Sequence, residues 1–138
     1  MIVADASVVV DVLLYPDSAA AHSLALRFAR REAICAPHLM DVEVGRTLRR
    51  FTLRGEISAV RAAESFDDLA GLSIRRYAHT ELLPRAFELR SNVTIYDGIY
   101  LALAELLDAP LLSCDAALAD VPGCTAAVEV LPVGAATD

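Results

Sequence analysis

The stretch Met1-Ile-Val-Ala-Asp5-Ala-Ser7-Val-Val-Val-Asp-Val-Leu-Leu14 decides how the rest of the chain folds. Its run Ile2–Ala4 is apolar without alternation, which is typical of a strand buried on both faces of a parallel sheet. Asp5 follows at the carboxyl end of that strand, where ligands bind in open α/β sheets. Asp5 or Ser7 could also cap a helix over Val8–Leu14. Position alone leaves both interpretations of Asp5 open.

Short apolar strands alternate with helical segments along the chain. We expect strands over Ile2–Ala4, Ala33–Ala36, Leu72–Tyr77, Leu111–Ser113 and Val128–Leu131. We expect helices over Val8–Leu14, Ala19–Arg31, Leu39–Arg54, Ser58–Leu69 and Ile95–Leu107, a helix capped by Thr80 that carries Pro84 and runs to Arg90, and a turn of helix from Asp115 to Ala119. Strands separated by helices predict an α/β fold with a mostly parallel sheet of about five strands. The tail to Asp138 is expected to fray.

Length and composition indicate one domain over residues 1–138. The hydrophobic share of 56% argues against disorder. No apolar run reaches the roughly 18 residues of a membrane span, and we expect no signal peptide. The cysteines Cys35, Cys114 and Cys124 lack metal-type spacing, so we interpret them as incidental thiols of a cytoplasmic protein.

The charge of the chain limits how it can meet nucleic acid. The formal net charge is −7, which argues against a simple electrostatic nucleic-acid binder. A nuclease remains compatible with this charge, because divalent cations held by acids invert the local sign. The chain contains Arg but no Lys.

Three further acids are expected near Asp5. Glu43 lies in the first turns of the helix after the second strand, and Asp115 directly follows the fourth strand. Helices that follow parallel strands begin at the carboxyl edge of the sheet, so Asp5, Glu43 and Asp115 should share that edge. Asp97 begins the helix before the fourth strand, and its helix neighbours Tyr100, Leu101 and Ala104 form an inward-facing apolar face. Asp97 is therefore either buried without a role or turned toward the site.

Converging carboxylates repel one another unless a cation lies between them. An all-oxygen ligand set favours Mg²⁺ or Mn²⁺ over zinc. His22, His38 and His79 are scattered along the chain and form no metal-binding motif. Such ions serve phosphoryl chemistry, which predicts a metal-dependent phosphodiesterase or phosphatase.

Four motifs in order resemble those of PIN-domain nucleases. They are Ile2-Val-Ala-Asp5-Ala-Ser7-Val, Pro37-His-Leu-Met-Asp-Val-Glu43-Val, Ile95-Tyr-Asp97-Gly-Ile-Tyr100 and Leu112-Ser-Cys-Asp115-Ala-Ala-Leu. The four motifs span nearly the whole chain. The length of the chain is similar to that of VapC toxins of bacterial toxin–antitoxin pairs.

The resemblance implies a PIN-like three-layer α/β/α sandwich whose metal-binding and catalytic acids are Asp5, Glu43, Asp97 and Asp115. It also implies an RNA substrate, a homodimer and inhibition by a VapB-type antitoxin. Ser7 matches a hydroxyl position that orders the first acid, and Ser113 stands where the family often has Thr. Gly98 stands where Ala is frequent, which should weaken that helix start by up to about 1 kcal/mol.

Arg46, Arg49, Arg50 and Arg54 follow Glu43 on one expected helix. They could grip RNA phosphates. They could equally form a solvated face with a Glu43–Arg46 ion pair.

The remaining acids and aromatic residues near the motifs receive simpler interpretations. Asp41 is a helix-start residue, and Asp11 and Asp120 are surface acids. Tyr96 could stack on a base, whereas Tyr100 is assigned to core packing.

Two other functions share parts of this pattern. A phosphoryl-receiver domain also clusters acids at the edge of a parallel sheet, but it uses a Lys that this chain lacks. A non-catalytic binding module could keep an acidic pocket as a relic. The presence of all four acids favours the nuclease.

Overall fold

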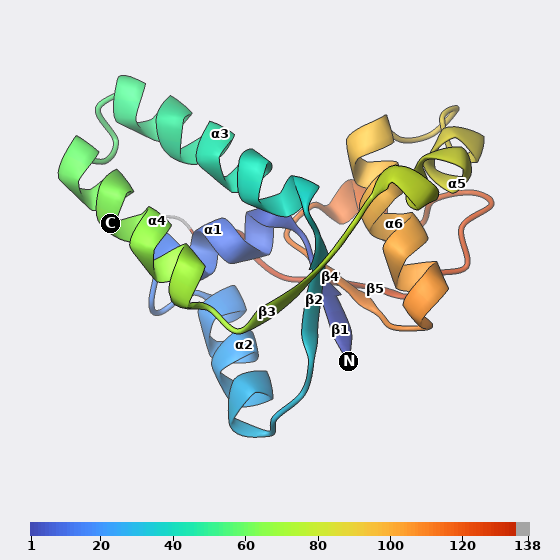
Figure 1. Ribbon diagram of the computed structural model, residues 1–138, viewed down its shortest axis with the longest axis horizontal. Coiled ribbons are helices and arrows are strands. Elements are labelled where there is room, and N and C mark those ends of the chain that lie inside the picture. The colour runs from blue at the N-terminus through green and yellow to red at the C-terminus, as the bar shows by residue number, and fades with distance from the viewer. Residues whose placement is uncertain (135–138) are drawn as a thin grey trace.

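The computed structural model describes residues 1–134 and contains one five-stranded sheet (Figure 1). Its strands are β1 (Ile2–Ala4), β2 (Ile34–Pro37), β3 (Ile74–Tyr77), β4 (Leu111–Ser113) and β5 (Val128–Val130). They lie in the order β3-β2-β1-β4-β5, and every neighbouring pair is parallel. The prediction of a parallel sheet is confirmed, and the expected tail to Asp138 lies partly outside the described residues.

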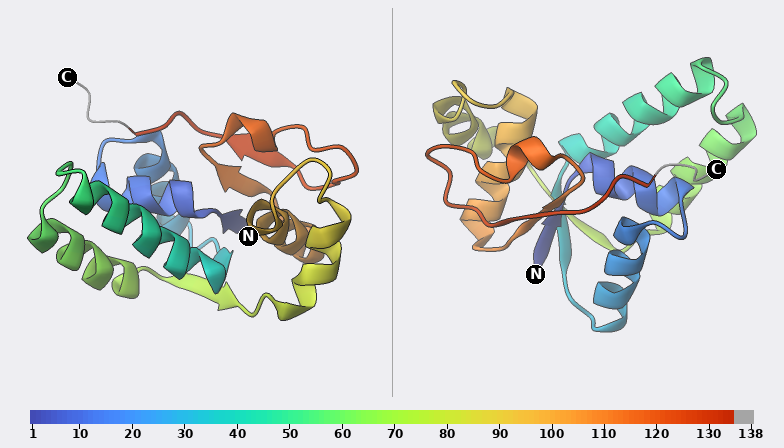
Figure 2. Two further views of the ribbon diagram at one scale, coloured as in Figure 1. Left: turned by 90° about the horizontal axis from the view of Figure 1, so that it is seen from above. Right: turned by 180° about the vertical axis from the view of Figure 1, so that it is seen from behind.

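Helices cover both faces of the sheet and give the predicted three layers. They are α1 (Ala6–Leu14), α2 (Ala19–Ala29), α3 (Leu39–Leu53), α4 (Ala59–Gly71), α5 (Leu83–Glu88) and α6 (Ile95–Leu107). Helices α1 to α4 lie on one face, and α5 and α6 lie on the other (Figure 1 and Figure 2). This division follows from right-handed crossovers, because the chain steps from β1 to β2 to β3 and then returns past β1 to β4.

The return of the chain creates a crevice between β1 and β4. These strands are neighbours in the sheet, and the connections that leave them run in opposite directions. Open α/β sheets bind ligands at this switch point, outside the carboxyl ends of the strands. Asp5 is the first residue after β1, and Asp115 is the second residue after β4, so both lie at the crevice.

The element bounds agree with the expected ones to within about two residues, apart from one segment. The segment Thr80–Leu82 is a short 3₁₀ helix, preceded by His79, and Thr80 therefore does not cap an α-helix. Pro84 gives the reason. An α-helix beginning at Thr80 would need the backbone of Pro84 to donate to Thr80, and proline has no N–H. Pro84 is instead in the first turn of α5.

The core is built from the central strands and α6. Strands β1, β2 and β4 are buried at every residue, and α6 is buried without interruption from Gly98 to Ala104. Their apolar runs therefore reflect burial on both faces, as the sequence pattern predicts. Within residues 1–134, no helix has the length and apolar character that crossing a membrane requires.

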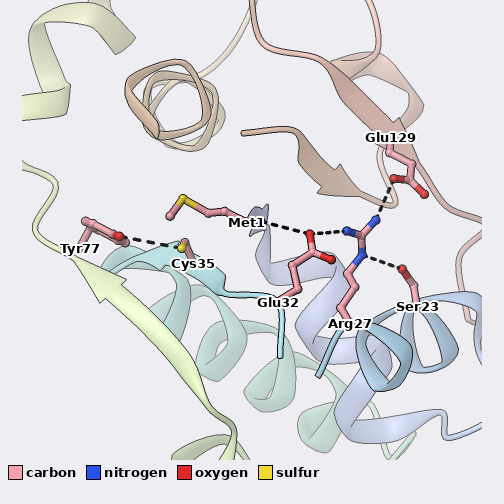
Figure 3. Close-up of polar contacts among 7 residues, drawn as sticks. All are labelled: Met1, Ser23, Arg27, Glu32, Cys35, Tyr77 and Glu129. Carbon is pink, nitrogen blue, oxygen red and sulfur yellow. Dashed lines mark hydrogen bonds and ion pairs between the residues drawn. The ribbon is translucent and has the colours of Figure 1, made fainter. Parts of the chain in front are cut away.

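Ion pairs lie at the amino edge of the sheet, which is the edge opposite the crevice (Figure 3). Arg27, in the last turn of α2, donates to Glu32 at 2.8 Å and to Glu129 of β5 at 3.2 Å. The amino group of Met1 lies 3.3 Å from the same Glu32 carboxylate. These contacts join α2 to both halves of the sheet at the edge away from Asp5.

Gly98 has a packing role that offsets its low helix propensity. A Cβ atom at this position would lie 3.0 Å from the backbone and Cβ of Ala86 in α5. Because backbone atoms cannot swing aside as a side-chain tip can, alanine would push α5 away from α6. Glycine therefore permits the close approach of these two helices.

Candidate active site at the carboxyl edge of the sheet

A pocket of about 520 Å³ lies at the carboxyl edge of the sheet, at the crevice between β1 and β4. Its walls come from α1, α3, α6 and the segment after β4. The four predicted acids all line it, together with Ser7: Asp5, Glu43, Asp97 and Asp115. Ser113 is fully buried behind Asp5. The structure thus brings together acids that are spread along the sequence from position 5 to position 115.

Asp5 is both the N-cap of α1 and a wall of the pocket, so the two interpretations of this residue are compatible. Its Oδ1 accepts hydrogen bonds from the Ser7 hydroxyl at 2.5 Å and from the Val8 N–H at 3.2 Å. Its Oδ2 accepts a hydrogen bond from the Ser113 hydroxyl. The carboxylate is only 7% exposed, and these donors hold it in one orientation.

The two serine hydroxyls also join β1 to the end of β4. The Ser7 hydroxyl accepts the backbone N–H of Cys114 at 3.0 Å, and the Ser113 hydroxyl accepts that of Asp115 at 3.0 Å. Each hydroxyl therefore donates to Asp5 and accepts from the segment after β4. Asp115 itself is exposed and accepts from the Ala117 N–H at 2.9 Å.

Glu43 and Asp97 approach the pocket from opposite layers of the sandwich. Glu43 lies in the first turns of α3 and accepts a hydrogen bond from the Tyr100 hydroxyl at 2.6 Å. Asp97 lies in the first turn of α6, where its N–H donates to the Thr94 hydroxyl at 3.2 Å. Thr94 is the N-cap of α6. The sequence signal for this cap is a Thr three residues before an acid, and we did not use this signal.

Burial raises the pKa of three of these acids above their ordinary values. For Asp5, hydrogen bonds from Ser113 and Ser7 oppose this rise in pKa. The pKa of Glu43 is raised by burial, lowered by the bond from Tyr100, and raised again by Asp97 and Asp5. The pKa of Asp97 is raised by burial and then by the charges of Asp115 and Asp5. The negative charges of these carboxylates therefore repel one another, and a cation bound between them would relieve this repulsion.

Comparison with known proteins agrees with this geometry. The PIN domain family matches residues 2–123. The chain belongs to the PIN-domain family. Ribonuclease VapC1 of Mycobacterium tuberculosis is 46% identical over 123 residues, which are 88% of this chain and 90% of that protein. Ribonuclease VapC12 of the same species is 37% identical over 131 residues, covering 95% and 99% of the two chains. The resemblance to PIN-domain VapC proteins is thereby confirmed.

The fold is also found in a solved structure. The crystal structure of VapBC2 from Rickettsia felis, bound to a DNA fragment from their promoter, superposes with a TM-score of 0.69. The match covers 95% of this PIN domain and 99% of that chain at 16% sequence identity, and it concerns the fold alone.

The donor chemistry of this PIN domain fits a hydrated divalent ion. Among residues 1–134, no three His, Cys, Asp or Glu side chains form a ready-made metal cluster. Mg²⁺ commonly keeps several waters and binds through only one or two carboxylates. A pocket lined by carboxylates that raise one another's pKa therefore fits such an ion better than a fully protein-ligated one.

The arginines of α3 divide into two groups. Arg46 and Arg50 line the pocket one turn apart, whereas Arg49 is not among its lining residues. Arg46, Arg49, Arg50 and Arg54 are all exposed, as expected of a solvated face. In the described part of the chain, however, no salt bridge within 4.0 Å joins Glu43 to Arg46, so the ion pair expected with that face is not formed. Arg46 nonetheless lowers the pKa of Glu43 through its charge.

Asp11 is not a surface acid, and this expectation was wrong. It is 4% exposed on α1 and lines the pocket. Its Oδ2 accepts the backbone N–H of Gly134 at 2.6 Å and faces the thiol of Cys114 at 3.5 Å. The C-terminal segment crosses the end of the sheet and buries this acid, a contact between ends of the chain that no local pattern predicts. Asp120 is exposed, as expected.

Asp41, Cys114 and Tyr100 each have a place or contact in the structure beyond the one that the sequence predicts. Asp41 is in the first turn of α3, as expected, and also pairs with Arg76 at 2.6 Å. Cys35 is buried, whereas Cys114 lines the pocket and was missed. Tyr100 is 2% exposed and belongs to the core, but its hydroxyl contacts the site.

Proposed function

We propose that this PIN domain is a divalent-metal-dependent endoribonuclease, the toxin of a toxin–antitoxin pair that acts in the cytoplasm. The observation that carries the proposal is the convergence of Asp5, Glu43, Asp97 and Asp115 on one pocket. Family membership supports it, because relatives that are 46% and 37% identical to this chain are named VapC ribonucleases. Mg²⁺ is the proposed ion, and Mn²⁺ should replace it.

The residues of the pocket divide the work of phosphodiester hydrolysis. One or two of the four acids would bind the hydrated ion directly and the others through its waters, and the ion would supply Lewis-acid stabilisation and a water of lowered pKa. Ser7 and Ser113 fix the orientation of Asp5. In the hydrolysis that this site would support, a water oxygen would bond to phosphorus while the bond from phosphorus to the 3′-oxygen breaks, and a water proton would end on that leaving oxygen. The products are a 5′-phosphate and a 3′-hydroxyl.

Cleavage mapping on total cellular RNA tests this function most broadly. The purified protein with Mg²⁺ should cut a small set of RNA sites, and single-stranded DNA of the same sequences should be cut less. Binding to RNA or protein without any cleavage would support the alternative of an acidic-pocket binding module instead.

Arg46 and Arg50 are proposed to contact RNA phosphates, since both line the pocket that would hold the scissile bond. Replacing Arg46 by alanine should raise the KM for RNA about 10-fold and reduce the salt dependence of binding by about one charge. Arg49→Ala is the matched control, because Arg49 has the same charge on the same helix but lies outside the pocket. Equal effects of the two substitutions would contradict this assignment.

A VapB-type antitoxin is the proposed partner, and its cationic side chain is expected to enter the acidic pocket. An Arg is favoured because its guanidinium can bridge two carboxylates. Its flanking apolar residues would pack beside α3, where Val42 is 71% and Leu53 is 69% exposed. Co-expression with the neighbouring gene product should abolish RNA cleavage, and rising Mg²⁺ should partly restore it. Inhibition with unchanged metal occupancy and RNA access would contradict this mechanism.

A homodimer is also proposed. Leu106 of α6 and Phe87 of α5 are 69% and 58% exposed, and such apolar side chains favour association. Most of α6 is nevertheless covered within the chain, so the apolar face available for a dimer is smaller than the sequence predicts. Light scattering at tens of micromolar should give twice the mass of one chain, and a monomer mass would count against the dimer.

A further inference from the structure

The hydroxyl of Tyr100 joins the two helices that bring acids to the pocket from opposite layers. Tyr100 lies on α6, one turn after Asp97, and donates to Oε1 of Glu43 on α3 at 2.6 Å. The tyrosine is 2% exposed, so its ring is fixed by the core. The hydroxyl therefore reaches the Glu43 carboxylate from a rigid base.

Glu43 needs such a support more than the other acids do. It has a longer side chain than the aspartates, and ordering it costs more rotamer entropy. Asp5 has donors to both oxygens. Among residues 1–134, the bond from Tyr100 is the one hydrogen bond made to the Glu43 carboxylate. Its Oε2 is left for the pocket, with Oε1 held by the tyrosine.

The chemistry of Tyr100 suits a neutral donor. Its phenol has one O–H, which donates to the Glu43 carboxylate without adding charge to the site. Phenylalanine would fill the core equally well, so packing alone does not account for a hydroxyl here.

We propose that Tyr100 is a positioning residue that fixes the Glu43 carboxylate so that Oε2 faces the divalent ion. The inference rests on the proposed metal-dependent function, because it assigns a role in metal affinity. Partners that orient a metal-ligating group typically contribute 10- to 100-fold to metal affinity.

Titration of the metal-free protein with Mn²⁺ by calorimetry tests the inference without an activity assay. Tyr100→Phe should weaken Mn²⁺ binding by about 10-fold or more. Tyr96→Phe is the matched control, since Tyr96 is on the same helix next to Asp97 but is 50% exposed, and it should bind Mn²⁺ as the wild type does. Wild-type affinity in Tyr100→Phe would overturn the proposal and leave Tyr100 as a core residue only.

Two further variants show whether the effect passes through Glu43. In a Glu43→Gln background, Tyr100→Phe should have little additional effect on Mn²⁺ affinity. If the double variant instead loses affinity by the product of the two single-variant factors, the two residues act independently and the proposal is overturned. If Tyr100→Phe does not fold, Glu43→Asp tests the same contact, because the shorter aspartate keeps the negative charge but moves the carboxylate away from the Tyr100 hydroxyl. It should lose affinity similarly, and wild-type affinity there would overturn the inference.

The outcomes also separate this inference from the proposed function. A wild-type protein that binds no Mn²⁺ would overturn both. A wild type that binds Mn²⁺ and a Tyr100→Phe variant of equal affinity would overturn only the role of Tyr100.

Discussion

An Asp97→Asn protein should fold as the wild type does and cleave RNA at least about 100-fold more slowly. The substitution preserves size and leaves the backbone N–H of residue 97 on the Thr94 hydroxyl, so α6 keeps its cap. It removes one charge from the carboxylates that line the pocket. Loss of a metal ligand costs several kcal/mol of transition-state stabilisation, and each 1.36 kcal/mol is about tenfold in rate.

The stability of Asp97→Asn should change in the opposite direction from its activity. Burial, Asp115 and Asp5 raise the pKa of Asp97 above 3.8, so the folded protein holds that proton more tightly than the unfolded chain does. The stabilisation from this proton is fully present below pH 3.8 and is lost as pH rises through the folded pKa. At neutral pH the ionised carboxylate therefore destabilises the metal-free fold, and asparagine removes that cost.

Thermal unfolding of the metal-free proteins at two pH values checks this sign. At neutral pH the midpoint of Asp97→Asn should equal or exceed that of the wild type, and any advantage should shrink in acid. Near wild-type cleavage by the folded variant, or a midpoint well below the wild type at neutral pH, would contradict the assignment of Asp97.

Asp5 should separate activity from stability when two substitutions are compared. Asp5→Asn and Asp5→Ala should both reduce cleavage at least about 100-fold, for the reason given for Asp97. Asparagine can still cap α1 and bond to both serines, because its amide has an acceptor and donors. Alanine removes the cap and leaves buried donors of Ser7, Val8 and Ser113 without their acceptor.

Chemical denaturation measures the difference between these two variants. The free energy of unfolding of Asp5→Ala should fall by about 1–3 kcal/mol relative to Asp5→Asn. Equal stability of the two variants would mean that the carboxylate is not the acceptor that holds α1 and β4 together. Full activity of either folded variant would remove Asp5 from the site.

The sequence predicts the sheet well because its decisive features are local. The apolar run Ile2–Ala4 has no polar face, which is typical of a strand covered on both sides of a parallel sheet. That topology then carries Asp5, Glu43 and Asp115 to one edge without any knowledge of distant contacts. The apolar helix face around Asp97 leaves its role open, and the family motifs assign it to the same pocket.

The errors and omissions all depend on long-range contacts or on backbone bonds. Asp11 was assigned to the surface because nothing near it reveals that Gly134 returns to cover it. Tyr100 was assigned to the core, and its bond to Glu43 depends on how α3 and α6 meet across the sheet. The 3₁₀ helix at Thr80 could have been foreseen from Pro84, which cannot donate a hydrogen bond four residues back.

The central claim is that the carboxylate pocket cleaves RNA through a bound divalent ion, and product analysis tests it most directly. A labelled RNA is incubated with the protein in Mg²⁺, in excess EDTA, and in EDTA followed by added Mg²⁺ or Mn²⁺, and the new RNA ends are identified. We predict that cleavage stops in EDTA, returns with either ion, and leaves 5′-phosphate and 3′-hydroxyl ends. Undiminished cleavage in EDTA, or 2′,3′-cyclic phosphate ends, would contradict the claim.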